Sequence, residues 1–170
     1  MIYSALFVNR NKALNSVFKL LTGYVIIEPN KKVNGKLKRG GRMMTYKELM
    51  IKSLSDLLDE NETLLYPVYG GLLQNRRNWF GYFGLTEKNL LIALLQGNQK
   101  EISWVSKVPL HIKKVEIKEK RLPKGYTVLI EFTEGNPFKA RISKKVFGID
   151  CQQENVEGFI EYLKNHEKQI

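Results

Sequence analysis

The most regular pattern in the chain is the stretch DCQQENVEGFIEYLK at residues 150–164. Apolar side chains recur there at positions i, i+3, i+4 and i+7, which is the spacing of one face of an α-helix. Asp150 and Gln153 stand where a reciprocal N-terminal cap forms. The stretch therefore predicts an amphipathic C-terminal helix, whose buried face consists of Val156, Phe159, Ile160 and Leu163.

Seven strand-like runs precede this helix, because from Thr63 onward the apolar spacing shortens to the two-residue period of a strand. Pro67 in the first run predicts an edge position or a bulge, since proline donates no hydrogen bond to a sheet. Short strands followed by one amphipathic helix are typical of a partly open β-barrel that the helix covers. The runs are Thr63–Tyr69, Trp79–Thr86, Asn89–Gln96, Glu101–Lys107, a stretch around Val115 and Ile117, Tyr126–Thr133 after a turn at Lys124-Gly125, and Phe138–Ile142.

Two further helices are predicted before the strands. The first covers Lys12–Leu21, and the second covers Tyr46–Leu58, where Thr45 and Glu48 form a T-x-x-E capping box. The run Leu90–Leu95 is apolar on both faces, which in an antiparallel sheet requires cover on both sides. We expect the two helices to supply that cover. The alternative is a protein partner or self-association across this surface.

Charge is unevenly distributed along the chain. The 28 Lys and Arg stand against 17 Asp and Glu, a net charge of +11, and residues 1–42 contain a single acidic residue, Glu28. A glycine-rich basic segment in this region is interpreted either as a flexible linker or as an arm that attracts phosphate on nucleic acid or lipid. The cations of this basic arm are Lys31, Lys32, Lys36, Lys38, Arg39 and Arg42.

No sequence pattern points to catalysis. Cys151 is the only cysteine, which excludes an intrachain disulfide and a cysteine-based zinc site. His111 and His166 have no nucleophile motif nearby, and no phosphate-binding glycine loop is present. We therefore expect no enzyme activity, cofactor, metal or small-molecule substrate. The absence of an export signal and of an apolar stretch of about 20 residues predicts a cytoplasmic protein, with peripheral membrane association left open.

Three motifs resemble the pleckstrin-homology (PH) superfold in its bacterial PH-like and GRAM-like form. An acidic turn at Asp59–Glu62 stands before the first strand. Gly81–Leu90 is similar to a strand-turn-strand pattern of the form G-x-L-x-L-T-x-x-x-L, and Val108–Val115 is similar to an I-P-L-x-x-I-x-x-V stretch that leads into strand five. The subgroup that the chain resembles most is the YokE-type bacterial PH domain.

The resemblance implies a mainly β (α+β) fold. It is a seven-stranded, antiparallel, partly open barrel that is capped by the C-terminal helix and carries an N-terminal helical extension. The match spans residues 58–167 and leaves the first 57 residues unexplained. We expect residues 1–58 to form the extension, with a basic flexible linker at residues 29–43, and residues 59–170 to form the PH-like domain.

The resemblance also implies a binding site. In lipid-binding relatives the open end of the barrel near the first strand-to-strand loop holds basic residues, and here that loop is Gly70–Asn78. Two leucines beside two arginines suit a loop that enters a lipid headgroup region, whereas the alternative is a loop of solvated charges. The phosphoinositide-binding pattern at the end of strand one is missing, and Glu134 near the same rim opposes anion binding. The candidate contacts are Arg76, Arg77, Lys100, Leu72 and Leu73.

We expect the chain to be a non-enzymatic binding or adaptor module that engages a protein partner or an anionic membrane surface. The alternative is a basic nucleic-acid-associated protein that binds phosphate non-specifically. Lys124-Gly125-Tyr126 is similar to the start of an RNA-recognition strand. The residues that follow lack the stacking aromatics of such a strand, so sequence-specific readout is not expected.

Overall fold

The computed structural model describes residues 44–97 and 101–167. The predicted helix at Lys12–Leu21, the basic arm and Lys100 lie outside the described residues. The described elements, in chain order, are α2 (Tyr46–Ser55), β1 (Leu65–Gln74), β2 (Arg77–Leu85), β3 (Asn89–Leu95), β4 (Ile102–Pro109), β5 (Ile112–Arg121), β6 (Lys124–Phe132), β7 (Phe138–Ser143) and α3 (Gln152–Glu167).

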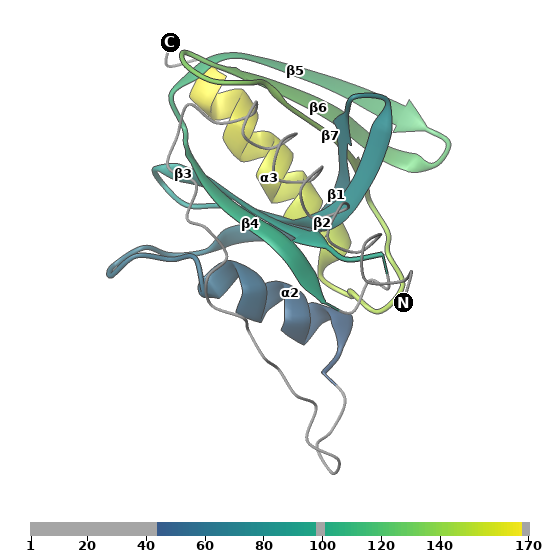
Figure 1. Ribbon diagram of the computed structural model, residues 1–170. Helices are drawn as coiled ribbons and strands as arrows, with labels where there is room; N and C mark the ends of the chain where they lie inside the picture. Colours follow the sequence, from purple (N-terminus) through teal and green to yellow (C-terminus); the bar gives the residue numbers. More distant parts are fainter. Residues whose placement is uncertain (1–43, 98–100, 168–170) are drawn as a thin grey trace, which may run out of the picture.

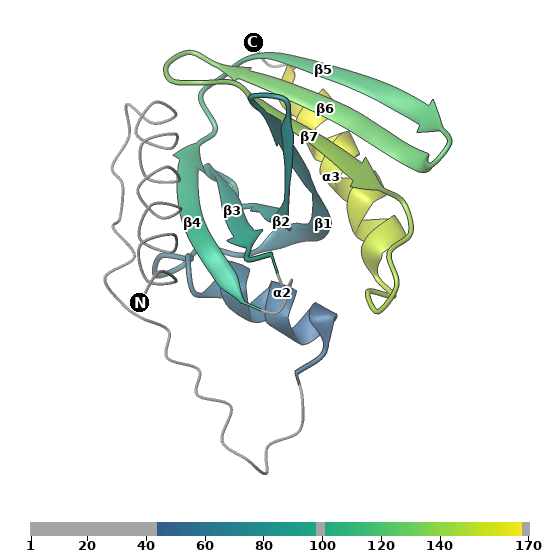
Figure 2. The ribbon, with the colours of Figure 1, turned by 45° about the vertical axis from the view of Figure 1, so that its right-hand side comes forward.

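The seven strands form one antiparallel sheet in the order β4-β3-β2-β1-β7-β6-β5. Figures 1 and 2 show the sheet folded over, so that β5, β6 and β7 form one layer and β2, β3 and β4 another. Within the described residues β4 and β5 do not pair with each other, so the barrel is partly open. Helix α3 packs against β1, β5 and β7 and covers the opening. The mainly β, PH-like fold class is therefore confirmed.

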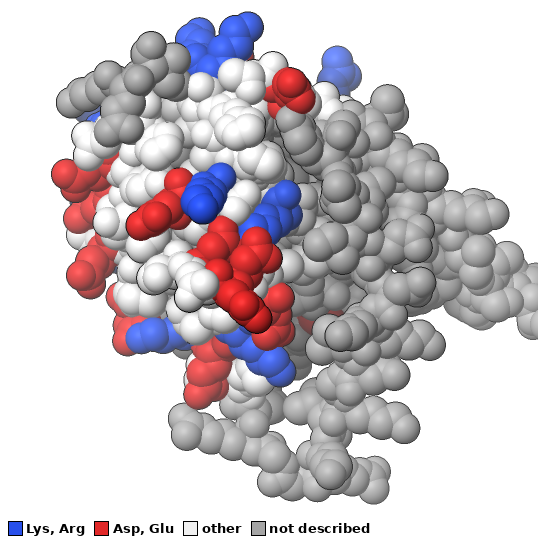
Figure 3. Space-filling view, turned by 90° about the vertical axis from the view of Figure 1, so that its left-hand side faces the viewer, with Lys and Arg blue, Asp and Glu red and all other residues white. Residues whose placement is uncertain are grey.

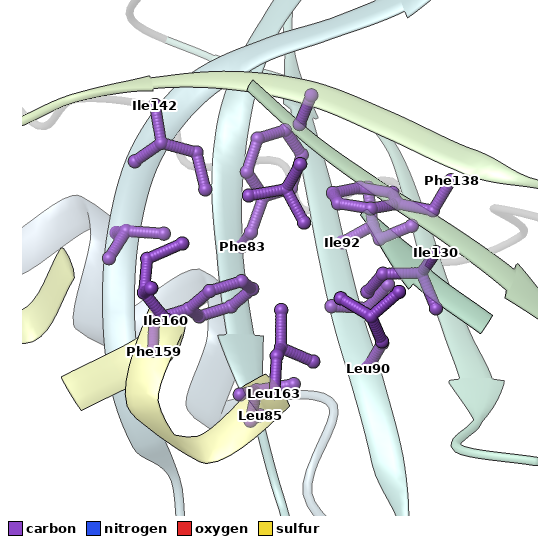
Figure 4. Close-up of a cluster of buried hydrophobic side chains, with 14 of the residues drawn as sticks. Phe83, Leu85, Leu90, Ile92, Ile130, Phe138, Ile142, Phe159, Ile160 and Leu163 are labelled. Atoms are coloured by element: carbon purple, nitrogen blue, oxygen red, sulfur yellow. The ribbon is translucent and has the colours of Figure 1, made fainter. Parts of the chain in front are cut away.

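Helix α3 completes the inner core of the barrel. Phe159, Ile160 and Leu163 point into the barrel toward Phe83 and Leu85 of β2 (Figure 4). Burial of each such side chain stabilises the fold by about 1.5–3 kcal/mol before conformational entropy is subtracted. The predicted apolar face of the helix is confirmed, because all four of its residues are at most 4% exposed: Val156, Phe159, Ile160 and Leu163.

Helix α2 covers part of the opposite face of the sheet. Met50 and Leu54 are fully buried and pack with Tyr82, Leu91 and Ala93 in an outer apolar cluster. The central strands are therefore covered on both faces, as the two-sided apolar run in β3 requires. Cover by an N-terminal helix is confirmed for α2.

The predicted capping box starts α2. The backbone amide of Glu48 donates to Thr45 Oγ1 at 3.2 Å, and the amide of Thr45 donates to Glu48 Oε2 at 2.7 Å. The helix ends at Ser55, before the predicted end at Leu58.

Strand β1 contains the bulge that Pro67 predicts. The register against β2 shifts between Leu65 and Val68, and Tyr66 inside the bulge has a φ angle of 47°. Strand β1 pairs with β7 only over Gly70–Leu72, so Pro67 also lies where β1 has no partner strand on that side.

Helix α3 begins at Gln152, and the predicted cap between Asp150 and Gln153 is wrong. The Asp150 carboxylate accepts from the Cys151 amide at 3.0 Å, and the Gln153 side chain donates to Glu157 at 3.4 Å. The Asp150 carboxylate also pairs with Lys47 of α2 at 3.0 Å, so neither side chain bonds to the other residue's backbone amide as a reciprocal cap requires.

The Gln152 side chain, which is 1% exposed, joins the start of α3 to two strands. Its oxygen accepts from the Tyr69 amide in β1 at 3.0 Å. Its nitrogen donates to the carbonyl oxygens of Tyr69 and Ser143, at 2.9 Å in each case. This side chain fixes the helix against the barrel at the point where α3 begins.

Candidate functional site

The described part of the chain is nearly neutral, but its charges are separated in space. It contains 17 Lys and Arg and 16 Asp and Glu, so ten of the eleven excess positive charges lie outside it. Residues 112–145, which form β5 to β7 and the start of the next loop, contain ten basic and four acidic residues. Residues 44–62 contain two basic and five acidic residues, and residues 152–167 contain one and four. The three-stranded layer is basic, and the helices and the acidic turn are acidic.

The acidic side of the molecule faces away from the β5–β6 hairpin. The tip of that hairpin lies at the right-hand edge of Figure 1. Figure 3 looks at the molecule from the opposite side, where acidic side chains outnumber basic ones among the described residues. The charge separation therefore gives the described part of the molecule an acidic side and a basic side.

Glu62, in the acidic turn, holds its charge through local bonds. Its carboxylate pairs with Lys107 of β4 and accepts from Asn89 Nδ2 at 2.6 Å, from Thr86 Oγ1 at 3.1 Å and from the Asp59 amide at 2.9 Å. Partial burial is the largest influence and raises the pKa, but these four bonds together lower the pKa of Glu62 to about 2. The turn therefore has a structural role, because it fixes the chain before β1 to the β2–β3 turn.

The basic side ends in the β5–β6 hairpin, whose two-residue turn is Leu122-Pro123. Arg121 pairs with Lys124 across the turn, and Lys120 pairs with Gly125. None of these three cations has an ion pair with a described residue. Leu122 is 91% exposed between them. The hairpin therefore presents an apolar tip among uncompensated positive charges.

The β7–α3 loop lies beside this hairpin. The Lys144 amide donates to the Lys124 carbonyl oxygen at 3.0 Å. The Lys144 ammonium group bonds to Glu119 at 3.1 Å and stands 5.0 Å from the centre of the Tyr126 ring. Lys145 follows, and Phe147 is 95% exposed. Loop and hairpin together form what we call the basic end of the molecule, which consists of residues 118–124 and 144–148.

Farther along the three-stranded layer, part of the positive charge is compensated. The Glu116 carboxylate bonds to Lys114 at 2.8 Å and lies 4.0 Å from Lys118. The ammonium groups of these residues and of Lys139 lower the pKa of Glu116, the bond from Lys114 contributing most. Among the described residues, four cations of the basic end have no ion pair (Lys120, Arg121, Lys124 and Lys145), against three in the rest of the layer (Lys113, Lys139 and Arg141).

The site predicted at residues 70–78 differs from the structure. Most of the predicted loop is strand, because β1 continues to Gln74 and the turn is Asn75-Arg76. Gly70 permits this course, since a Cβ atom there would lie 2.7 Å from the Arg141 carbonyl oxygen of β7. Leu72 is 7% exposed in the inner core, so its prediction as a surface contact is wrong.

The other predicted contacts differ in exposure, and some lie outside the described residues. Arg76 and Arg77 are exposed at the β1–β2 turn, and Leu73 next to them is half-buried. Glu134 is exposed in the β6–β7 loop. Lys100 and the basic arm lie outside the described residues, so the structure does not test them. Their proposed roles stay predictions.

The sequence-based prediction missed the basic end. Its signal is present at residues 120–124, KRLPK, where one leucine and a proline stand among cations. The Lys124-Gly125 pair predicts a turn at that position, since glycine is a common turn residue. The structure places the turn two residues earlier, which makes Leu122 the tip.

The described residues contain neither a metal-binding cluster nor a membrane-spanning helix. No group of three or more His, Cys, Asp or Glu side chains is arranged to hold a metal ion in this part of the chain. Among the helices of residues 44–97 and 101–167, none is long and apolar enough to cross a membrane.

Comparisons with known proteins found a similar solved structure but no matching family. No family model matches the chain, and no curated protein matches it. A solved structure, the hSac2 domain from human phosphoinositide phosphatase Sac2, is similar with a TM-score of 0.46 and 12% sequence identity. The alignment covers 71% of this chain and 80% of that one. The PH-like topology therefore rests on this chain's own strand order and C-terminal helix.

Proposed function

We propose that the chain is a non-enzymatic binding module that contacts an anionic membrane through its basic end. The observation that carries this proposal is the charge separation, with ten basic against four acidic residues in 112–145 and the opposite excess on the helices. Such a charge distribution orients a protein toward an anionic surface before contact. Each lysine near an anionic bilayer adds about 1 kcal/mol to binding. Membership of the bacterial PH-like, YokE-type subgroup is part of the proposal and rests on the three sequence motifs.

Sedimentation with vesicles tests this proposal. The double variant Lys120→Glu/Lys124→Glu is compared with Lys88→Glu/Lys164→Glu, which changes the total charge equally but at the β2–β3 turn and on α3. With vesicles containing one third phosphatidylserine in 50 mM salt, we expect the first variant to bind at least about tenfold more weakly, and the second to bind within about threefold of the wild type. Equal losses in both variants, or equal wild-type binding to neutral vesicles, contradict the proposal.

Non-specific binding to nucleic acid is a second candidate, which the location of the remaining charge favours. Ten of the eleven excess positive charges lie outside the described residues, and six of those cations form the basic arm at residues 31–42. A salt series with duplex DNA measures this activity, because the logarithm of the affinity falls linearly with that of the salt concentration. Substituting the six arm cations with glutamine reduces the slope if they bind phosphate.

A further inference from the structure

Two apolar side chains in the described part of the chain are far more exposed than the rest. Leu122 is 91% exposed and Phe147 is 95% exposed. The other large hydrophobic residues in the exposed class are between 37% and 49% exposed: Met44, Tyr46, Ile51, Tyr66 and Phe80. A single exposed leucine is ordinary on a protein surface. Two nearly bare side chains on segments that a backbone hydrogen bond joins require an explanation.

Both tips belong to the basic end. The Lys144–Lys124 backbone bond, at 3.0 Å, ties the start of the β7–α3 loop to the base of the β5–β6 hairpin. Arg121 and Lys124 flank Leu122. Lys145 stands two residues before Phe147, which lines a hollow beside the start of α2 with Thr45 and the Lys47–Asp150 ion pair. In Figures 1 and 2 the hairpin turn and the loop both lie on the right-hand side of the molecule, with the acidic side opposite.

We propose that Leu122 and Phe147 insert between the lipids of an anionic bilayer, while the cations beside them contact lipid phosphates. This inference rests on the proposed function and names the residues and the orientation by which the membrane is bound. An apolar tip ringed by cations matches the layers of a bilayer surface, where anionic headgroups overlie hydrocarbon. A nucleic acid backbone offers phosphates but no apolar layer for a leucine, so the tips favour the membrane.

The two parts of this contact respond differently to salt. Salt screens the attraction between lysines and phosphates, because the Debye length falls from about 10 Å at 0.1 M to about 3 Å at 1 M. Transfer of an apolar side chain out of water is not screened in this way. Loss of the tips therefore weakens binding by a similar factor at low and high salt, whereas loss of the cations weakens it mainly at low salt.

The full-length variant Leu122→Ser/Phe147→Ser tests the inference, with Met44→Ser/Ile51→Ser as the matched control. The control removes two partly exposed apolar side chains at and before α2. On vesicles with one third phosphatidylserine, at 50 mM and 300 mM salt, we expect at least a tenfold loss of affinity for the tip variant at both concentrations, and less than a threefold loss for the control. Binding of the tip variant within threefold of the wild type, while Lys120→Glu/Lys124→Glu still binds weakly, overturns insertion and leaves the proposed function standing. Absence of wild-type binding to anionic vesicles overturns both.

A direct probe of insertion does not depend on affinity. Leu122→Cys in a Cys151→Ser background carries an environment-sensitive dye, and Ser55→Cys at the end of α2 is the control position. We expect a blue shift of the dye at residue 122 when anionic vesicles are added, and none at residue 55. An unshifted dye at residue 122 on bound protein overturns the inference. An equal loss of duplex DNA affinity in the tip variant does so as well, because the tips would then act on nucleic acid.

Discussion

At the turn before β1, one carboxylate accepts four hydrogen bonds and keeps its charge at low pH. The folded-state pKa of Glu62 is about 2, below the value of about 4.3 for an unfolded chain. A lowered folded pKa stabilises the fold above the unfolded pKa, and this stabilisation is lost as the pH falls through the folded pKa. We expect Glu62→Gln to lower the free energy of unfolding by about 2–3 kcal/mol at pH 7. Urea unfolding measures the difference.

The pH dependence of this difference in unfolding free energy tests the role of the Glu62 charge directly. Between pH 5 and pH 2 the difference between wild type and Glu62→Gln shrinks to below about 1 kcal/mol, because the wild-type carboxyl also becomes protonated. Glu60→Gln, at an exposed position in the same turn, is the control and stays within about 0.5 kcal/mol of the wild type throughout. A constant difference for Glu62→Gln across this pH range contradicts the assigned role.

At the scale of the element, the start of α3 depends on one buried amide. Gln152 bonds to both backbone groups of Tyr69 and to the carbonyl of Ser143. Gln152→Ala removes all three bonds and leaves buried strand groups without them, at a cost of about 2–4 kcal/mol in the free energy of unfolding. The adjacent Gln153→Ala changes an exposed side chain and costs less than about 0.5 kcal/mol. Chemical denaturation compares the two, and equal costs contradict the prediction.

Elements with a local pattern were predictable from the sequence, and contacts between distant residues were not. The period of Val156 and Phe159 marks α3, and the Thr45–Glu48 pair marks the start of α2. Gln152 bonds to a strand residue 83 positions away, which no local spacing indicates. The adjacent Gln153 stands three residues after Asp150, which is the spacing of a capping box, so the local pattern pointed to Gln153 and not to Gln152.

The candidate site was harder to predict, because the exposure of a leucine in the fold, and not its residue type, determines whether it can contact a ligand. Leu72 and Leu122 are both leucines near basic residues in the sequence, yet one is 7% and the other 91% exposed. The glycine pair at 70–71 indicated the end of a strand. In the sheet Gly70 is instead the point where β1 passes close to β7. Pairing across the sheet buries Leu72, and the two-residue turn at 122–123 exposes Leu122.

At the scale of the whole molecule, the sheet separates two apolar clusters, and α2 covers the outer one. Leu54→Asp in the full chain places a charge in that cluster, so we expect a fall of about 10 °C or more in melting temperature, together with increased binding of a hydrophobic dye. Ile51→Asp on the same helix, at a 38% exposed position, is the control and is expected to melt within about 2 °C of the wild type. An unchanged melting temperature in Leu54→Asp would show that α2 is not part of the folded unit.

The opposite signs on the two sides also determine how copies of the chain meet. A two-fold dimer whose interface lies within one side brings like surfaces together, which here means acid against acid or base against base. Attraction instead favours the acidic side of one copy against the basic side of the next, a head-to-tail contact that does not close on itself. Because the full chain carries a net charge of +11, copies repel one another at low ionic strength, so this head-to-tail contact is expected to orient brief encounters and not to build long arrays.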